Sequence, residues 1–396
     1  MKKYLIIGIA ALAALASCTK VGIDESQIPD KKISFEVASY VPQTRANSSL
    51  DSEGYNSFTT NAWFFAAAGK GTDMQYMNGV TVSKGTDSWA PADDYYWPKS
   101  GYINFYSYAG TRTPAVSASA DFKTVTMAYT NQEIAATDNI LVAKPALHYT
   151  ANTNEVSYDK ALGEFNYETG YAYDSATDGG YSGVPTIFQH MLAKVAFIVK
   201  LKTTDAKKSA NTTWTVEVLN DGTNNSNIIP VKKGTLSLSN TEAATAAAIG
   251  EWTNTNTAEP AIGWVAGSDT ETIAFAGKTL TIQPNATESA ETDNKLVEVR
   301  TVMPQLTSGV DFNLSYKVTA SHGATNFMEE IINVTSSNLA AAVSSITKWE
   351  MNKVYIYTIT IDPVTQKVTF DPAVVEWEAA TNGAINIDEN GAIVTP

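Results

Sequence analysis

Many short segments with alternating or clustered apolar residues, separated by turns rich in Gly, Asn and Pro, dominate this sequence. Residues 33–38, Ile-Ser-Phe-Glu-Val-Ala, alternate strictly, which is typical of a strand with one buried face. Residues 187–199 form the longest apolar stretch after the predicted signal peptide. Helix-forming segments are few, and 241–249 and 337–343 are the Ala-rich ones. The pattern predicts an all-β protein, and the length of 396 residues fits two β-sandwich domains.

The last part of the chain predicts a hairpin followed by a tail. Residues 353–361 and 367–370 alternate and flank the turn segment 362–366. Residues 374–377, Val-Val-Glu-Trp, predict one more core strand. The tail 378–396 then carries two Asn-Gly turn signals, at 382–383 and 390–391.

The N-terminus predicts a signal peptide over residues 1–17. Lys2 and Lys3 precede an apolar run over residues 4–15. A helix of this length would span only about 18 Å, whereas a bilayer core is about 30 Å thick. Leu15-Ala16-Ser17-Cys18 resembles the lipobox of bacterial lipoproteins, and that resemblance implies a lipid anchor on Cys18. The alternative is an ordinary secretory peptide that happens to end near a Cys.

Composition disfavours several functional classes. The formal net charge is −14, whereas proteins that bind nucleic acid are normally basic. One Cys excludes an intramolecular disulfide, and three His leave little for metal or acid–base chemistry. No motif of a hydrolase, nucleotide-binding loop or zinc protease is present. We therefore expect no enzyme activity, no cofactor and no metal, and we interpret His190 as a hydrogen-bonded residue at a strand end.

The aromatic residues between positions 95 and 108 allow two interpretations. Their rings could fill the core and edges of a sandwich, because aromatic side chains favour strands. Alternatively, exposed rings such as Trp97 could stack on sugars, which would make the protein a surface-anchored glycan-binding lipoprotein that does not polymerise. The residues concerned are Tyr95, Tyr96, Trp97, Tyr102, Phe105, Tyr106 and Tyr108.

In their order along the chain, several segments together resemble the fimbrillin-like family, the type V pilins. No single segment is diagnostic. The resemblance extends over residues 1–377 and rests on Cys18; the alternating strand followed by Thr44-Arg45; Tyr96-Trp97-Pro98; Phe188-x-His190-x-Leu192-Ala193-Lys194-Val195; Met303-Pro304-Gln305; Trp349-x-x-Asn352-Lys353-x-Tyr355-x-Tyr357; and Phe370-x-Pro372-Ala373-Val374-Val375-x-Trp377.

This resemblance implies a fimbrial subunit that reaches the outer membrane and cell surface as a lipoprotein and binds other subunits, of its own or a related kind. It implies a propeptide over 18–45, transthyretin-like sandwiches over 46–184 and 185–377, and the tail 378–396. In the family, an Arg-specific protease cuts after an arginine that matches Arg45, leaving Ala46 as the new N-terminus. The removed strand matches residues 33–41, and a C-terminal segment of another subunit replaces it.

The residues themselves support such an exchange. Ile33, Phe35 and Val37 would each contribute about 1.5–3 kcal/mol when buried. Their removal would leave an apolar slot between unpaired strand edges, which is a template for an added strand. The tail offers Ile385, Ile387, Ile393 and Val394 as candidate donor residues, although its Asn-Gly signal at 390–391 could instead fold it into its own hairpin.

Overall fold

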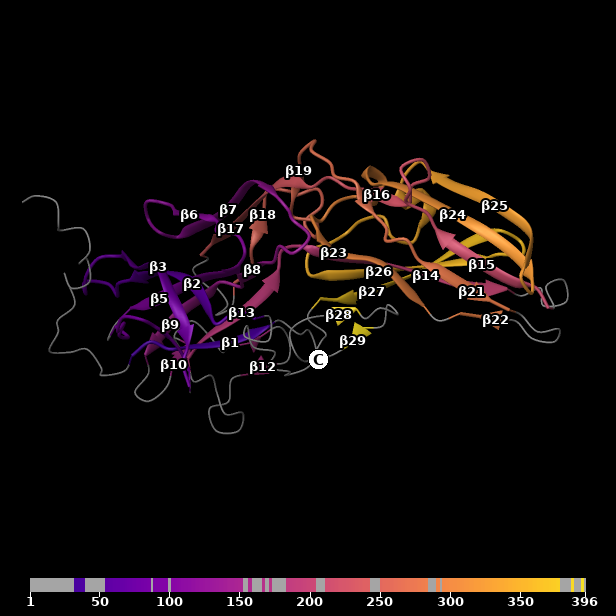
Figure 1. The fold of residues 1–396 in the computed structure, drawn as a ribbon. Helices are drawn as coiled ribbons and strands as arrows, with labels where there is room; N and C mark the ends of the chain where they lie inside the picture. The colour runs from indigo at the N-terminus through magenta and orange to yellow at the C-terminus, as the bar shows by residue number, and fades with distance from the viewer. Residues whose placement is uncertain are drawn as a thin grey trace, which may run out of the picture.

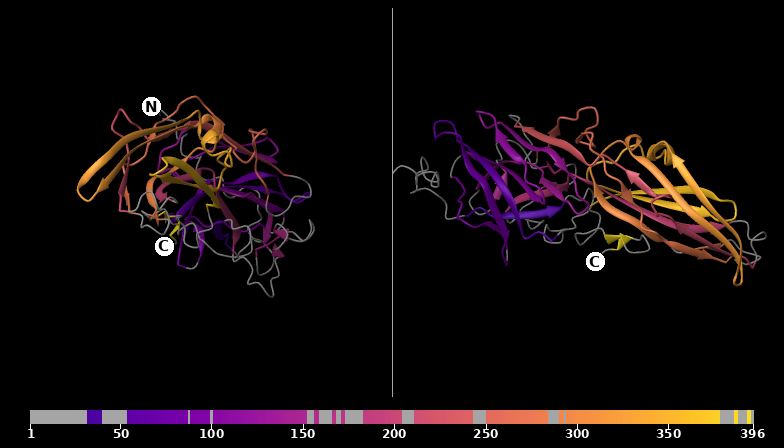
Figure 2. Two further views of the ribbon diagram at one scale, coloured as in Figure 1. Left: turned by 90° about the vertical axis from the view of Figure 1, so that its right-hand side faces the viewer. Right: turned by 45° about the horizontal axis from the view of Figure 1, so that its top comes forward.

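The computed structural model describes residues 32–39, 54–86, 88–98, 101–151, 156–158, 166–167, 171–172, 183–203, 211–242, 250–283, 290–292, 294–377, 386–387 and 393–394. The described part is almost entirely β-structure, as predicted, and it is elongated (Figures 1 and 2). The N-terminal strands lie at one end and strands of the C-terminal half at the other. The predicted helix at 337–343 is present as α2 (Leu339–Ala342) with Asn338 as its N-cap, whereas residues 243–249 lie outside the described part.

The first sheet closes on itself. Its strands are β1 (Phe35–Ser39), β2 (Ser57–Phe65), β3 (Met74–Lys84), β4 (Trp89–Pro91), β5 (Tyr102–Gly110), β8 (Ile140–Ala143), β9 (Ala146–Ala151), β10 (Val156–Tyr158) and β13 (Val184–His190). They follow the order β10-β9-β5-β2-β3-β4-β1-β13-β8, and β8 also pairs with β5. Because β8 pairs at both of its edges, the strands from β5 through β1 to β8 form a closed ring in which β1 is one member.

A second sheet contains β6 (Ala115–Ala118), β7 (Thr124–Glu133), β17 (Lys233–Thr241), β18 (Thr253–Asn254) and β19 (Val265–Ala266). β17 pairs with β7, and β13 pairs with β1 and β8. Strands from both sides of residue 184 therefore share the first two sheets. The division into domains 46–184 and 185–377 stays a prediction.

Two further sheets face each other in the C-terminal half. One contains β14 (Ala193–Thr203), β22 (Ala290–Glu291), β23 (Lys295–Val302), β26 (Lys353–Asp362) and β27 (Lys367–Glu376). The other contains β15 (Thr213–Val218), β16 (Asn227–Ile229), β20 (Ile273–Ala274), β21 (Thr279–Ile282), β24 (Asp311–His322) and β25 (Thr325–Ser336). The remaining elements are β11 (Asn166–Tyr167) with β12 (Tyr171–Ala172), β28 (Asn386–Ile387) with β29 (Ile393–Val394), and the 3₁₀ helix η4 (Thr307–Gly309).

The described residues form three hydrophobic cores. One fills the inside of the closed sheet, and a second lies between the outer face of that sheet and the sheet of β7 and β17. The third lies between the two C-terminal sheets. β14 is shared: Val195, Phe197 and Val199 enter the third core, whereas Ala196 and Ile198 enter the second. Successive side chains of β14 thus alternate between two cores, which explains why this strand is apolar on both faces.

Candidate functional site

β1 is a buried member of the closed sheet and the segment on which the predicted exchange depends. It runs parallel to β13, with Phe35 opposite Val184 and Val37 opposite Thr186 (Figure 1). Ile33 and Phe35 are each 1% exposed and Val37 is 7% exposed. All three predicted inward-facing residues therefore belong to the core inside the closed sheet.

Phe35 lies at the centre of an aromatic cluster. Its ring meets Phe58 of β2 and Phe105 of β5 edge to face, with ring centres 5.5 Å and 5.6 Å apart. Phe58 in turn contacts Trp89 and Phe188, on the strands that flank β1. Edge-to-face pairs add about 0.5–1.5 kcal/mol each beyond the burial of area. The position of Phe35 thus selects a large, flat apolar side chain.

The backbone of β1 is held unequally on its two sides. Toward β13, the pairing extends over five residues, and Val184 N donates to Ser34 O at 2.8 Å. Toward β4, the ladder contains the single pair of Phe35 and Trp89. Just before β1, an isolated bridge joins Lys32 to Tyr96, and Ile33 N donates to Tyr95 O at 2.7 Å. β1 is therefore paired less extensively with β4 than with β13.

Gly183 permits the close approach of β1 to the start of β13. A Cβ atom on Gly183 would lie 2.6 Å from Ser34 O and 2.7 Å from Phe35 N, well inside contact distance. A glycine in such a place lets two backbones meet where a side chain would separate them. Gly183 was not among the residues predicted from the sequence, where a Gly next to a strand is the only signal for it.

An ion pair marks the entry of β1. Lys32 Nζ lies 2.8 Å from Asp94 Oδ2, and this hydrogen bond raises the pKa of Lys32 and lowers the pKa of Asp94. Both side chains are more than half exposed, so the pair adds little to stability. Its effect is to fix where the chain enters the sheet.

The other predicted site residues fall into two groups. Cys18, Arg45, Ala46 and Ile385 lie outside the described residues. In the tail, Asn386 pairs with Val394 and Ile387 with Ile393, so β28 and β29 form an antiparallel hairpin. Of the two arrangements left open for the tail, the backbone pairing matches the hairpin.

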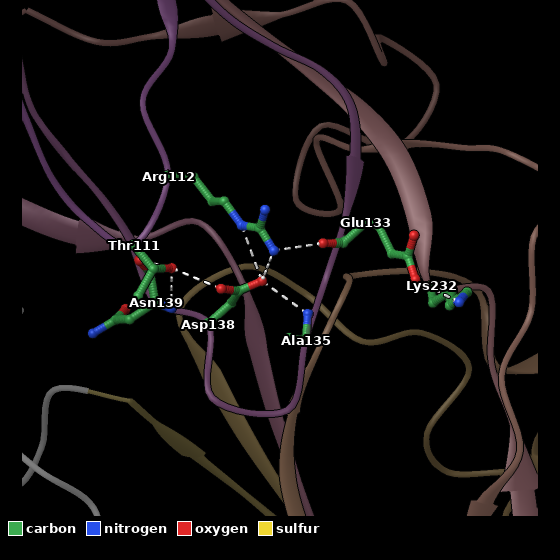
Figure 3. Close-up of polar contacts among 7 residues, drawn as sticks. All are labelled: Thr111, Arg112, Glu133, Ala135, Asp138, Asn139 and Lys232. Atoms are coloured by element: carbon green, nitrogen blue, oxygen red, sulfur yellow. Dashed lines mark hydrogen bonds and ion pairs between the residues drawn. The ribbon is translucent and has the colours of Figure 1, made fainter.

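The chain contains three arginines, and the two other than Arg45 are engaged in ion pairs. Arg112 donates through Nε and Nη2 to Asp138 Oδ2, at 3.1 Å and 2.6 Å, and through Nη2 to Glu133 O (Figure 3). Burial works against the charge of Asp138, but the bonds from Arg112, Ala135 N and Thr111 hold its pKa below the ordinary value. Arg300 pairs with Glu271 at 2.8 Å.

The aromatic segment fills the core instead of forming an exposed platform. Trp97 is fully buried, and Phe105 and Tyr106 are buried as well. Tyr102 packs flat between Phe65 and His148. The glycan-stacking interpretation that named Trp97 as an exposed ring is therefore wrong, because this indole has no surface to offer a sugar.

His190 lies at the end of β13 in ordinary polar and aromatic contacts. His190 Nδ1 lies 2.8 Å from Asn139 Oδ1, and its ring stacks on Trp377, as expected of a satisfied strand-end residue. Within the residues the structure describes, no group of three or more His, Cys, Asp or Glu side chains is arranged to hold a metal. The same residues contain no helix of the length and hydropathy needed to cross a membrane.

A buried polar cluster joins the closed sheet to the end of β17. Glu242 accepts hydrogen bonds from Tyr102 and from Asn104 Nδ2, the latter at 2.7 Å, and lies 3.2 Å from His148 Nε2. The side chains of Glu242 and His148 are only 5% and 3% exposed. Burial would raise the pKa of Glu242, but the bonds from His148, Tyr102 and Asn104 hold it below the ordinary value.

The sequence model of the fimbrillin-like family matches residues 44–377. Among solved structures, a fimbrial protein from Bacteroides vulgatus is 12% identical, with a TM-score of 0.45 over 87% of this chain and 99% of that one. The fimbrial anchor protein Mfa2 from Porphyromonas gingivalis is 10% identical, with a TM-score of 0.26 over 87% of this chain and 97% of that one. A search of curated protein sequences finds no significant match.

Proposed function

The chain belongs to the fimbrillin-like family, and on that premise we propose that it is a structural subunit of a cell-surface fimbria that assembles by exchanging β1 for a strand of another subunit. The observation that carries the proposal is the position of β1. β1 completes a closed sheet, and its three inward side chains are buried. Its pairing with β4 consists of a single ladder pair. A segment so placed can be removed and replaced as a unit.

The route to the surface begins with Cys18. We assign it as a lipid anchor that holds the precursor in the outer membrane until cleavage after Arg45 releases residues 18–45, with β1 among them. The sequence model of the family matches from residue 44 onward, so β1 lies outside the matched region. In the fold, however, β1 completes a sheet whose other strands all belong to that region. That is the arrangement expected of a propeptide strand.

Cleavage at Arg45 is favoured by how the other arginines are used. A protease must draw the scissile segment into an extended form with the arginine side chain free. Arg112 would have to give up Asp138 and Glu133, and Arg300 would have to give up Glu271. Arg45 is also the only Arg or Lys between Lys32 and Lys70. We therefore assign Ala46 as the N-terminus of the mature subunit.

Loss of β1 leaves an apolar slot between β4 and β13. Tyr95 O and Val184 N lose their partners, and the rings of Phe58 and Phe105 lose a neighbour. Unpaired edges beside exposed apolar side chains favour the addition of a strand. The partners are other fimbrial subunits, and the tail with Ile385, Ile387, Ile393 and Val394 is this chain's candidate donor. The function is structural and not enzymatic.

The test combines cleavage with exchange. The chain without its leader is treated with an Arg-specific protease and incubated with a labelled peptide of residues 31–41. We expect one early cut, a new N-terminus at Ala46, and uptake of the peptide by the cut chain alone. The Arg45→Lys variant keeps the positive charge but lacks the arginine that the protease recognises, so it stays uncut and takes up no peptide. Early cutting at Arg112 or Arg300, or a cut chain that never exchanges β1, would contradict the proposal.

A further inference from the structure

The slot has defined requirements at three positions. Its occupant must present inward side chains two residues apart, where β1 presents Ile33, Phe35 and Val37. The middle position is bounded by Phe58 and Phe105, with ring centres within 5.6 Å of Phe35. All three positions belong to one continuous core. A filling strand therefore needs an aliphatic, an aromatic and a β-branched side chain in alternation.

The tail of the same chain contains a segment that partly resembles β1 and the residues before it. Residues 385–389 read Ile-Asn-Ile-Asp-Glu, and residues 33–37 read Ile-Ser-Phe-Glu-Val. The outward positions match in character, Asn for Ser and Asp for Glu. Of the inward positions, only the first is the same, because Ile387 takes the place of Phe35 and Glu389 takes the place of Val37.

Both mismatches disfavour binding. An Ile in the middle position lacks the flat ring that Phe58 and Phe105 enclose, which leaves unfilled volume in a close-packed core. A Glu in the third position brings a carboxylate to a place where Val37 is 7% exposed, and burying an unpaired charge is strongly unfavourable.

Other registers of the tail also fail to fill the slot. A shift by two residues places Gly383, Ile385 and Ile387 at the inward positions, which avoids the buried carboxylate but leaves the first position empty and the middle one without an aromatic ring. Within residues 378–396, no three positions spaced two apart carry three large apolar side chains, in either chain direction. Residues 392, 394 and 396 come nearest outside the first segment, but they are Ala, Val and Pro. The strand residues of the tail are also paired with each other, Asn386 with Val394 and Ile387 with Ile393.

From this mismatch, which rests on the function proposed above, we infer that the slot of this subunit is filled by a strand from a different polypeptide and not by the tail of a second copy. That partner carries a bulky aliphatic, an aromatic and a β-branched residue at alternating positions. The subunit is thus built for contact between unlike subunits, and it does not form a homopolymer by itself.

The test measures exchange into the chain cut after Arg45, with four labelled peptides in competition with the native β1 fragment. One peptide spans residues 31–41 and one spans residues 382–396. A third carries Ile387→Phe and Glu389→Val in the tail peptide, which restores the inward pattern of β1. The fourth carries Phe35→Ile and Val37→Glu in the 31–41 peptide, which gives it the inward pattern of residues 385–389.

We expect the 31–41 peptide, and the tail peptide with Ile387→Phe and Glu389→Val, to bind at least about 100-fold more tightly than the unchanged tail peptide. The reason is that the unchanged tail packs poorly in the slot and, in the register of residues 385–389, also buries a charge. The 31–41 peptide with Phe35→Ile and Val37→Glu binds as weakly as the unchanged tail. If the unchanged tail bound within about threefold of the affinity of the 31–41 peptide, the inference would be overturned, because so small a difference means that the tail fits the slot. Strand exchange itself would still stand. Failure of the 31–41 peptide itself to exchange would overturn the proposed function, and the inference with it.

Discussion

Gly183 and Ser34 approach so closely that a methyl group on Gly183 would lie 2.6 Å from the Ser34 carbonyl oxygen. The same oxygen accepts a hydrogen bond from Val184 N at 2.8 Å. The contact joins the start of β1 to the start of β13, which are the first and the last strands of the closed sheet in chain order. It therefore limits how closely β1 can approach β13.

Gly183→Ala is therefore expected to loosen β1 without touching its side chains. The added Cβ must push Ser34 away, and overpacking of this kind costs about 1–3 kcal/mol. After cleavage at Arg45, the β1 fragment should dissociate faster than from the unchanged protein, which release of a labelled fragment would measure. Gly309→Ala is the control, because a Cβ there meets nothing within 4 Å. Equal release rates for the two variants would contradict the role given to Gly183.

Phe35→Ala is expected to destabilise the uncut protein by about 3–5 kcal/mol, because it leaves a cavity between Phe58 and Phe105. Urea unfolding followed by tryptophan fluorescence would measure the change. Thr81→Ser, at an exposed position of β3 in the same sheet, should stay within about 0.5 kcal/mol. A loss of less than about 1 kcal/mol for Phe35→Ala would mean that β1 does not help to hold the core together.

Glu242→Ala is expected to cost about 3 kcal/mol or more, since it removes the buried acceptor shared by Tyr102, Asn104 and His148. Chemical denaturation would measure the loss. Glu329→Ala on the exposed side of β25 serves as the control and should change stability by less than about 0.5 kcal/mol. Similar values for both variants would show that the cluster does not join β17 to the closed sheet.

The Arg112–Asp138 pair predicts a pH dependence. The pKa of Asp138 is lowered in the folded protein, so its contribution is full above the ordinary value of 3.8 and is lost as the pH falls through the folded pKa. Arg112→Ala should cost about 2 kcal/mol at pH 7, with the difference from the unchanged protein shrinking below about pH 4. Denaturation curves at several pH values would check this.

The control for that series is Lys232→Ala. Lys232 Nζ lies 2.5 Å from Glu133 Oε1, whose side chain is largely exposed (Figure 3). A surface pair of this kind contributes about 0–1 kcal/mol. A pH profile for Arg112→Ala that runs parallel to that of the unchanged protein would show that Asp138 is not stabilised by Arg112.

Strands could be predicted from local sequence where one buried face imposes an alternation of apolar and polar residues. The strand expected at 33–38 is β1, and the hairpin expected around 362–366 is β26 with β27. The sequence suggested a break near Pro372, yet β27 continues through it. Among the described residues β27 pairs with β26 alone, and a proline is tolerated at such an edge because no partner needs its missing N–H.

Long-range features could not be read in the same way. The apolar stretch 187–199 is divided at Met191 and Leu192 between two strands of different sheets. Nothing local indicates that β1 would pair with β13 rather than with a neighbour in sequence. The burial of Ile33, Phe35 and Val37 was predictable from alternation, whereas the partners that enclose them, and the buried carboxylate of Glu242, depend on how distant segments meet.

β14 has a mechanical consequence for a fibre subunit. It contributes side chains to two cores and pairs along its length with β26 in parallel and with β23 in antiparallel register. These strands run along the long direction of the molecule (Figure 1). Ladder hydrogen bonds lie across the strands, so tension between the ends loads many of them in shear at once instead of opening them one after another. Under the strand exchange proposed above, a pull along the molecule is therefore expected to separate one subunit from the next before it opens the body of the subunit, because β14 is held by longer ladders than β1.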